Sequence, residues 1–197
     1  MKNLIGLSLG FILLACSPSI QSVESSKSEQ DSLLVLAEKG DAGAQLKLAL
    51  RMEQDGHYEE AARWYEAAAQ QGESRAQNNL GVLYKDGQGV AQDYAEAVRW
   101  FSMATRQGNA MAQSNLAWLY QSGLGVARNN TEALRLYRQA AAQGHAAAQN
   151  NLGTMYMHGL GVACDTDSAV FWFERAASQG LAVARQNLLK CVRSDTR

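Results

Sequence analysis

A repeated, glycine-bounded block is the feature that most constrains this chain. Glycines recur at intervals of 36 residues, at Gly72, Gly108, Gly144 and Gly180. Between them the same residue types return in the same order, so the stretch reads three times over. Self-similarity at such a period is typical of a solenoid, because each short unit buries its apolar side only by stacking on its neighbours.

Each block is predicted to form two helices joined by a glycine turn. The first copy of the shared pattern reads Ala76-Gln77, Asn79-Leu80-Gly81, Tyr84, Gly87-x-Gly89-Val90, Asp93, Ala97, Trp100-Phe101 and Ala104. Apolar residues spaced by three and four predict a first helix over about 73–85. The glycine pair ends it, and Asp93 followed by Glu96 is a capping pattern that begins the second helix.

The repeats set the expected organisation of the chain. Residues 1–15 are expected to be a signal peptide, and 16–31 to carry a lipidated cysteine and a flexible tether, for the reasons given below. A capping helix over 32–40 and a divergent repeat over 41–72 come next. Three full repeats cover 73–108, 109–144 and 145–180, and a closing half-repeat covers 181–197. In the capping helix, Leu33 and Leu36 take the places of Phe101 and Ala104.

The N-terminus has the features of an export and anchoring signal. Lys2 precedes a twelve-residue apolar run that ends at Ala15, which is too short to span a bilayer. The ending Leu-Leu-Ala-Cys resembles a bacterial lipobox, whose cysteine is lipidated, and this predicts lipidation of Cys16. Ser17 after the cysteine favours the outer membrane. The alternative is an ordinary secretory signal with an incidental cysteine.

Charge and motif content argue against several functions. The net charge is −1, which gives no basic footprint for nucleic acid. The Gly-x-Gly pairs follow a helix and have no phosphate-loop lysine, and no cluster of His, Cys, Asp and Glu has the spacing of metal ligands. No cofactor, metal site or catalytic residue is predicted.

The repeat pattern is similar to that of the Sel-one-like repeat family, a relative of the tetratricopeptide repeats. The resemblance covers about residues 33–192 and rests on Ala-Gln, Asn-Leu-Gly, Tyr and Gly-x-Gly-Val at a 36-residue period. It implies an all-α, right-handed superhelical solenoid of helix-turn-helix repeats. It also implies a concave groove lined by the first helix of each repeat, and an adaptor role that is not enzymatic.

Amide side chains on the first helices are candidates for binding a partner. The relatives use the positions beside the buried leucine, and a run of amides suits a peptide backbone. These positions hold Asn78, Asn79, Asn115, Asn150, Asn151 and Asn187. For the series that begins with Asn79, the alternative is a structural tie between each first helix and the neighbouring turn. The series that begins with Asn78 is expected to be free.

Trp118 is a second candidate for binding a partner. It lies at an outward position, and the equivalent residues of the other repeats differ from it and from one another in size. Met111 and Met157 occupy nearby outward places, and a tryptophan beside methionines suits an apolar anchor. The alternative is that Trp118 packs between repeats. Cys164 and Cys191 either form a disulfide in an oxidising compartment or remain separate thiols.

These observations predict a membrane-anchored periplasmic scaffold that holds a peptide or helix of an envelope protein in its groove. One alternative is binding of peptidoglycan or a β-lactam-like ligand, with weak hydrolysis. Another is a purely structural protein whose convex face matters. The oligomeric state is not predicted.

Overall fold

The structure is a computed structural model that describes residues 31–194, with side chains placed through residue 191. The predicted signal peptide, Cys16 and most of the tether lie outside the described residues. Residues 31–38 are helical. The helices that follow are α2 (Ala42–Gln54), α3 (Tyr58–Gln70), α4 (Ser74–Asp86), α5 (Tyr94–Arg106), α6 (Ala110–Ser122), α7 (Asn130–Ala142), α8 (Ala146–His158), α9 (Thr166–Ser178) and α10 (Ala182–Ser194).

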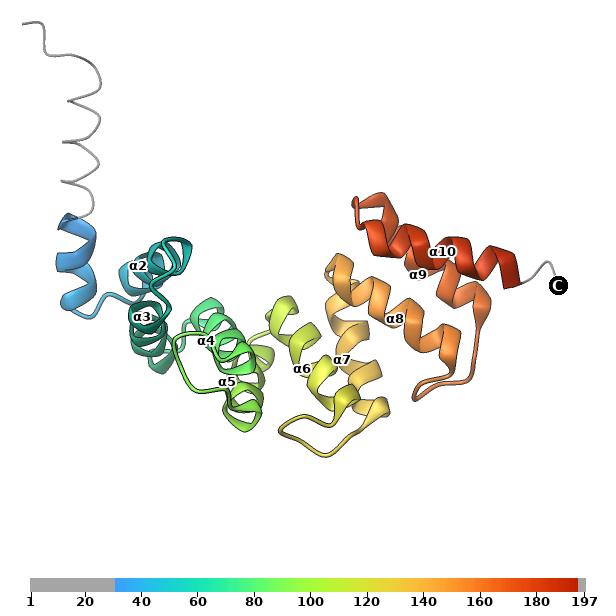
Figure 1. The fold of residues 1–197 in the computed structure, drawn as a ribbon, viewed down its shortest axis with the longest axis horizontal. Coiled ribbons are helices and arrows are strands. Elements are labelled where there is room, and N and C mark those ends of the chain that lie inside the picture. The colour runs from blue at the N-terminus through green and yellow to red at the C-terminus, as the bar shows by residue number, and fades with distance from the viewer. Residues whose placement is uncertain (1–30, 195–197) are drawn as a thin grey trace, which may run out of the picture.

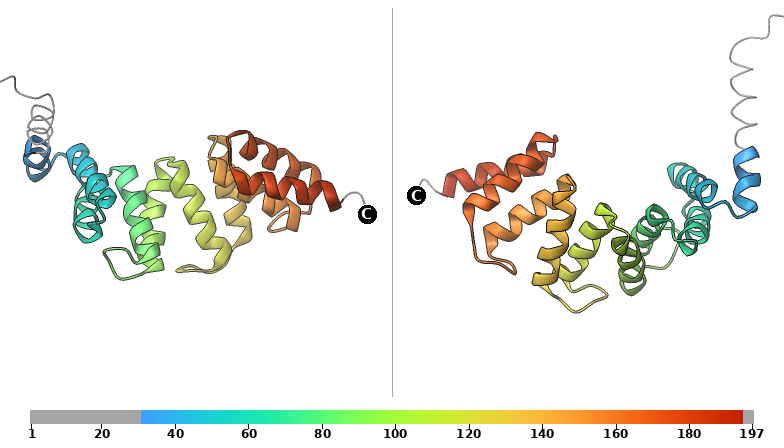
Figure 2. Two further views of the ribbon diagram at one scale, coloured as in Figure 1. Left: turned by 45° about the horizontal axis from the view of Figure 1, so that its top comes forward. Right: turned by 180° about the vertical axis from the view of Figure 1, so that it is seen from behind.

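The helices pack as consecutive pairs, each in contact with the next pair along the chain. We call α2, α4, α6, α8 and α10 the first helices and α3, α5, α7 and α9 the second helices. Each first helix packs on the second helix that follows it, and each second helix packs on the next first helix. Figure 1 shows the stack as an open arc, and both views in Figure 2 keep the pairs in sequence order. The predicted all-α solenoid is confirmed.

Small residues on the first helices let the two helices of a repeat approach closely. A Cβ added to Gly81 would lie 2.7 Å from Cε1 of Phe101, and one added to Gly153 would lie 2.8 Å from Cε1 of Phe173. Both rings are fully buried. The missing side chain therefore provides the space that the aromatic ring of the second helix fills.

The second glycine of each turn joins neighbouring repeats. Gly89 has a φ of +67°, and a Cβ there would lie 2.2 Å from the carbonyl carbon of Tyr58, the first residue of α3. Gly125 has the same relation to Tyr94, and Gly161 meets Asn130. The Gly-x-Gly turn is therefore a packing element, because it seats each turn on the second helix of the preceding repeat.

The predicted N-caps of the second helices are confirmed. Asp93 accepts hydrogen bonds from the backbone N–H groups of Ala95 and Glu96, at 2.8 and 3.1 Å. Asn129 and Asp165 cap α7 and α9 in the same way. Glu96 does not complete a capping box, in which its carboxylate would accept a hydrogen bond from the backbone N–H of Asp93. The carboxylate pairs with Arg99 at 2.9 Å instead.

The two ends of the array are half-repeats. Leu33 packs against a small cluster formed by Ala37, Ala44 and Leu48, so the segment 31–38 covers part of the first repeat. At the other end, α10 packs mainly on α9. Among the described residues, none of the helices combines the length and apolar character needed to cross a bilayer.

Candidate binding surface

The first helices lie on the inner side of the arc. Side chains of successive first helices meet directly, as Asn78 of α4 meets Asn115 of α6 and Asn150 of α8 meets Asn187 of α10. In a curved stack, the inner layer has the shorter spacing between repeats. We therefore assign the concave side to the first helices, in agreement with the arc in Figure 1.

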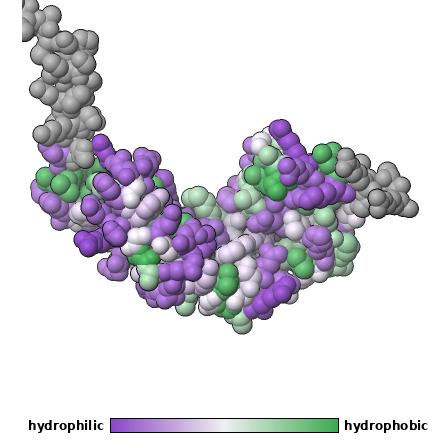
Figure 3. Space-filling model, viewed as in Figure 1, coloured by the Kyte–Doolittle hydropathy of each residue, from purple (hydrophilic) through white to green (hydrophobic). Residues whose placement is uncertain are grey.

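Two large apolar side chains of α6 are exposed on this side. Trp118 is 40% exposed and Met111 is 43% exposed. They are seven residues apart, so two helical turns place them on one face. Figure 3 shows a mostly polar surface with separate apolar spots. The other exposed large apolar residues of the described chain lie in the segment 31–38 and on α9 and α10, whereas Met111 and Trp118 lie near the middle of the array.

The concave side near Trp118 carries almost no charge. Helix α6 contains no Asp, Glu, Lys, Arg or His, and α8 contains only His158. The second helices differ, since α7 alone carries Glu132, Arg135 and Arg138. The first helices α2, α4 and α10 also carry charged residues, so the uncharged, amide-rich strip is confined to α6 and α8.

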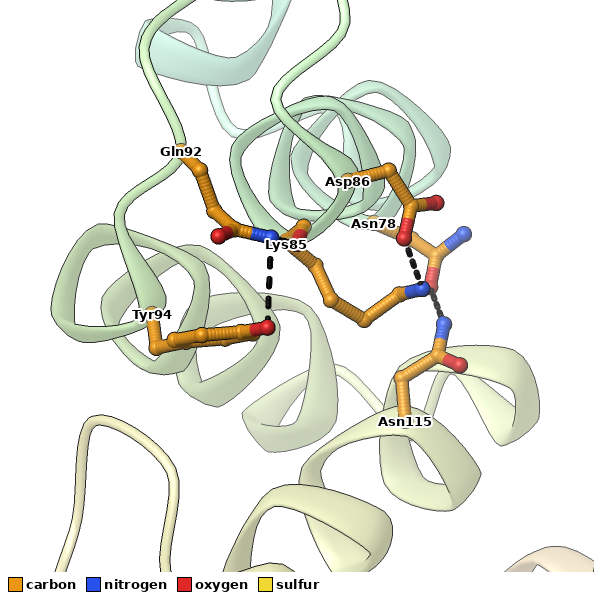
Figure 4. Close-up of polar contacts among 6 residues, drawn as sticks. All are labelled: Asn78, Lys85, Asp86, Gln92, Tyr94 and Asn115. Atoms are coloured by element: carbon orange, nitrogen blue, oxygen red, sulfur yellow. Dashed lines mark hydrogen bonds and ion pairs between the residues drawn. The ribbon is translucent and has the colours of Figure 1, made fainter.

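Lys85 of α4 borders this strip. Its ammonium lies 5.7 Å from the ring centroid of Trp118 and also pairs with the neighbouring Asp86. Figure 4 shows Lys85 reaching across from α4 toward α6, beside the contact between Asn78 and Asn115. The ammonium thus lies over the ring of an exposed tryptophan, where cation–π attraction is favourable.

The predicted amide residues form a hydrogen-bonded network inside the protein. Asn79 donates to the hydroxyl of Tyr65 at 3.1 Å and accepts from Asn78 at 3.1 Å. Asn115 in turn donates to Asn78 at 3.1 Å (Figure 4). This chain of contacts connects α3, α4 and α6, so it links three successive repeats.

A second network of the same kind lies two repeats further on. Asn150 donates to Asn151 at 3.4 Å and accepts from Asn187 at 3.0 Å. Asn151 forms a hydrogen bond with the hydroxyl of Tyr137. Ser114 stands at the equivalent position between the two networks, where a shorter side chain replaces the asparagine.

These contacts correct one expectation. Asn78 and Asn150 are not free: they are 3% and 8% exposed, because each lies between the first helices of two adjacent repeats. Asn79, Asn115, Asn151 and Asn187 are half-buried and tie the first helices to a tyrosine or to the preceding first helix. The structural alternative for this series is therefore realised, although its partners are helices and not turns.

Burial changes the acidity of the two tyrosines in these networks. Burial raises the pKa of Tyr65, and a hydrogen bond to the carboxylate of Glu53 raises it further. Burial also raises the pKa of Tyr137, while the contact with Asn151 lowers it in part. Both hydroxyls therefore stay protonated at neutral pH and serve as fixed structural partners.

Sequence reasoning missed the role of the glutamine in each Ala-Gln pair. Gln77 is 1% exposed, donates to the backbone carbonyl of Ala69 at 3.0 Å and accepts from Gln107 at 2.9 Å. The same glutamine pairs recur in the other repeats as Gln45–Gln71, Gln113–Gln143 and Gln149–Gln179. The recurring glutamine after each glycine boundary was the available signal.

Met157 is also placed differently from the prediction. It is half-buried and packs against a cluster that contains Phe173 and Cys191, because α10 covers this end of α8. Cys191 Sγ lies 3.6 Å from Met157 Sδ, and Cys164 Sγ lies 3.2 Å from the Met157 carbonyl oxygen. Cys164 is exposed and carries a free thiol, so no disulfide joins it to Cys191 in the structure.

The remaining hollows and polar groups do not form a chemical site. One shallow depression is lined by Glu60, Arg63, Trp64 and Ala67 of α3. His145 caps α8 by accepting from the backbone N–H of Ala148 at 3.2 Å, and burial lowers its pKa. Within residues 31–194, His, Cys, Asp and Glu do not gather into a group of three that would suit a metal ion.

Comparison with known proteins places these repeats in a family context. The family model described as the Sel1 repeat matches residues 42–73, 74–109, 110–145 and 146–181. A protective antigen of uropathogenic Escherichia coli strains, described as displaying an SLR fold, has a similar structure with 38% identity and a TM-score of 0.74. That match covers 78% of this chain and 34% of the antigen, so the chain spans about one third of the antigen's length.

A second solved structure covers more of its own chain. A Sel1 repeat protein from Oxalobacter formigenes has 31% identity and a TM-score of 0.75, over 88% of this chain and 72% of that one. No curated protein matches this chain.

Proposed function

Because the chain belongs to the Sel1 repeat family, whose members act as protein-interaction scaffolds, we propose that it is a non-enzymatic scaffold whose concave side binds a peptide segment of another envelope protein. The binding surface consists of Met111 and Trp118 on α6, bordered by Lys85 of α4. The partner contributes an apolar side chain that packs on Trp118, and its uncharged backbone lies along α6 and α8.

One observation carries this proposal: a large aromatic ring is exposed on a helix without charge. Trp118 is 40% exposed although most large apolar side chains of the array are buried. Tryptophan is enriched among the residues that dominate binding energy, provided that a partner can remove it from water. The lack of charge on α6 reduces the desolvation cost of an apolar contact there.

The proposed location follows from the N-terminal sequence, which lies outside the described residues. Cys16 ends a lipobox-like motif, and we propose that it is lipidated and holds the array beside a bacterial membrane, on the periplasmic side of the outer membrane. The serine-rich stretch after it then serves as a tether. Acyl chains contribute about 0.8 kcal/mol per buried methylene, so more than one chain gives stable anchoring.

Site-specific photo-crosslinking in intact cells tests the binding surface. A photoreactive residue at position 111 is compared with one at position 171, because Met111 and Phe171 are similarly exposed, at 43% and 47%, on a first and a second helix. We expect a partner to crosslink at position 111 only. Trp118→Ala is expected to reduce that product by about tenfold or more, and Phe171→Ala to leave it unchanged.

Two outcomes would contradict the proposal. Equal crosslinking at positions 111 and 171 would mean that partners do not bind preferentially to the concave side. If Trp118→Ala still gives the crosslinked product at position 111, the aromatic ring is not part of the binding surface. If the variant loses binding to purified cell wall and not to any protein, the peptidoglycan alternative replaces the peptide.

The anchor is tested separately. We expect the wild-type chain to incorporate labelled palmitate and to fractionate with the outer membrane. Cys16→Ala should abolish both, while Cys164→Ala should change neither. Palmitate incorporation into Cys16→Ala at the wild-type level would refute lipidation at this residue.

A further inference from the structure

The two ends of the described array expose faces that every internal repeat buries. Within an internal repeat, the first helix packs closely on its own second helix. At the C-terminal end, α10 is a first helix, and no second helix follows it among the described residues. At the N-terminal end, the segment 31–38 stands in the place of a second helix, and no first helix precedes it among those residues.

Leu189 marks the open face of α10. Steps of 36 residues from Gly81 lead to Ala117, Gly153 and then Leu189. In the internal repeats this position is small because the aromatic ring of the second helix lies against it, as Phe101 does at Gly81. In α10 the position holds a leucine that is 59% exposed, the largest exposed fraction among the large apolar residues that the structure describes.

Leu36 marks the open face of the segment 31–38, and Leu33, which also packs on Ala44 and Leu48 of the first repeat, borders it. Leu33 lies 32 residues before Tyr65, at the aromatic position of the second helix, and Leu36 lies 32 residues before Ala68. Ala68 is fully buried against its own repeat, whereas Leu36 is 49% exposed. A leucine therefore replaces an aromatic residue at one position and an alanine at the other.

These two open faces are complementary in helix type and in size. We propose that α10 of one copy packs on the segment 31–38 of a second copy and completes a helix pair, so that copies associate head to tail. The internal pairs combine a small residue with an aromatic one, such as Gly153 with Phe173. The junction would combine Leu189 with Leu33, which fills a similar volume with two leucines.

The proposed contact continues an interface that the chain already uses. The pairs α2–α3, α4–α5, α6–α7 and α8–α9 all show the same packing of a first helix on its second helix. A face on one end that binds a different face on the other end generates an open series of copies. This association uses surfaces distinct from Met111 and Trp118, so it is independent of the proposed peptide binding.

Sedimentation velocity of the full chain in detergent, with single and mixed variants, tests the proposal. We expect the wild-type chain to form dimers, trimers and longer species as its concentration rises. Leu36→Glu and Leu189→Glu each place a carboxylate in the junction, and each variant is expected to be monomeric. An equimolar mixture of the two retains one intact junction, so it should form one-to-one dimers and nothing longer.

The mixture distinguishes this arrangement from a symmetric dimer. In a symmetric dimer both substitutions would lie in the one shared patch, so mixing the two variants would not restore association. Phe171→Glu is the matched control, because Phe171 is 47% exposed but lies on α9, and we expect it to assemble like the wild type. The proposal is wrong if the wild-type chain stays monomeric, if either leucine variant still assembles, or if the mixture remains monomeric. Circular dichroism checks that both variants keep the wild-type helix content.

Discussion

At the residue scale, each repeated residue type fulfils a separate geometric requirement. Gly89 allows a turn to touch the preceding repeat, Gly81 makes room for an aromatic ring, and Gln77 connects two repeats by donating to the carbonyl of Ala69. None of these roles requires a ligand. The residues that repeat are therefore mainly structural, and the residue that differs, Trp118, is the better candidate for a partner.

Gly89 and Gly108 give a matched test of this interpretation. Both have positive φ, but a Cβ at Gly89 would lie 2.2 Å from the Tyr58 backbone, whereas a Cβ at Gly108 would meet nothing within 4 Å. We expect Gly108→Ala to lower the free energy of unfolding by about 1–2 kcal/mol, for its backbone conformation alone. Gly89→Ala adds a clash with backbone, so its loss should exceed about 4 kcal/mol. Urea denaturation measures both, and equal losses would contradict the packing role.

His145 makes the stability of the array dependent on pH. Burial lowers its pKa, and its Nδ1 accepts the capping hydrogen bond from Ala148. The unfolded chain therefore takes up a proton first as the pH falls. Stability is complete above about pH 6.5, the ordinary histidine value, and declines as the pH falls from there toward the lowered pKa.

The chain supplies its own control for this prediction. Asn109 occupies the equivalent cap of α6 and accepts from Ala112 at 3.0 Å. His145→Asn should therefore keep the cap and flatten the part of the pH profile just below pH 6.5. Thermal unfolding at a series of pH values measures this, and an unchanged slope would assign the dependence to other groups.

At the scale of the elements, the helices are held in register by contacts within and between repeats. In each repeat a glutamine pair connects the end of the second helix with the first helix that precedes it, and the asparagine networks connect first helices across the concave side. The asparagine networks are interrupted at Ser114, while a glutamine pair recurs in every repeat, from Gln45–Gln71 to Gln149–Gln179. The glutamines are thus the regular tie of the array.

A double-mutant cycle measures this tie. Gln77→Ala and Gln107→Ala each remove one side of a hydrogen bond of 2.9 Å. We expect their effects on the free energy of unfolding to be coupled by about 0.5–1.5 kcal/mol. The matched cycle of Gln107→Ala with Gln113→Ala should show no coupling, because Gln113 pairs with Gln143. Additivity in the first cycle would mean that the pair contributes nothing measurable.

At the scale of the whole molecule, the array is nearly one-dimensional, because each repeat contacts only its neighbours. Stability in such a stack is approximately a sum of repeat terms and junction terms, so a local defect need not unfold the whole. An elongated shape also places its binding surfaces far apart. The concave surface at α6 and the two ends can therefore act independently.

Phe173→Ala tests how far a defect spreads. The ring is fully buried against Gly153, and its removal is expected to cost about 3–5 kcal/mol in the last repeat. Hydrogen exchange should then accelerate in α8, α9 and α10 while α2 and α3 keep their protection. Equal acceleration in α2 would show that the array unfolds as one cooperative unit.

Most of the architecture was predictable because its signals are local and recur. Spacing of apolar residues identifies the helices, Asp93 and its equivalents mark where second helices begin, and glycines mark the breaks. The 36-residue period then dictates stacking, because no single repeat can bury its own apolar residues. The sequence by itself thus determined the helix pairs, their order and the identity of Trp118 as the exception.

The burial of individual polar and end residues was decided only by the tertiary structure. Asn78 follows the same local pattern as an exposed amide, but the neighbouring first helix covers it. Met157 is covered because α10 lies over it, and Leu36 and Leu189 are exposed because no internal helix covers their faces. Each of these outcomes depends on which side chain of another repeat comes close, and that proximity is set by the curvature of the stack, which a periodic sequence pattern does not encode.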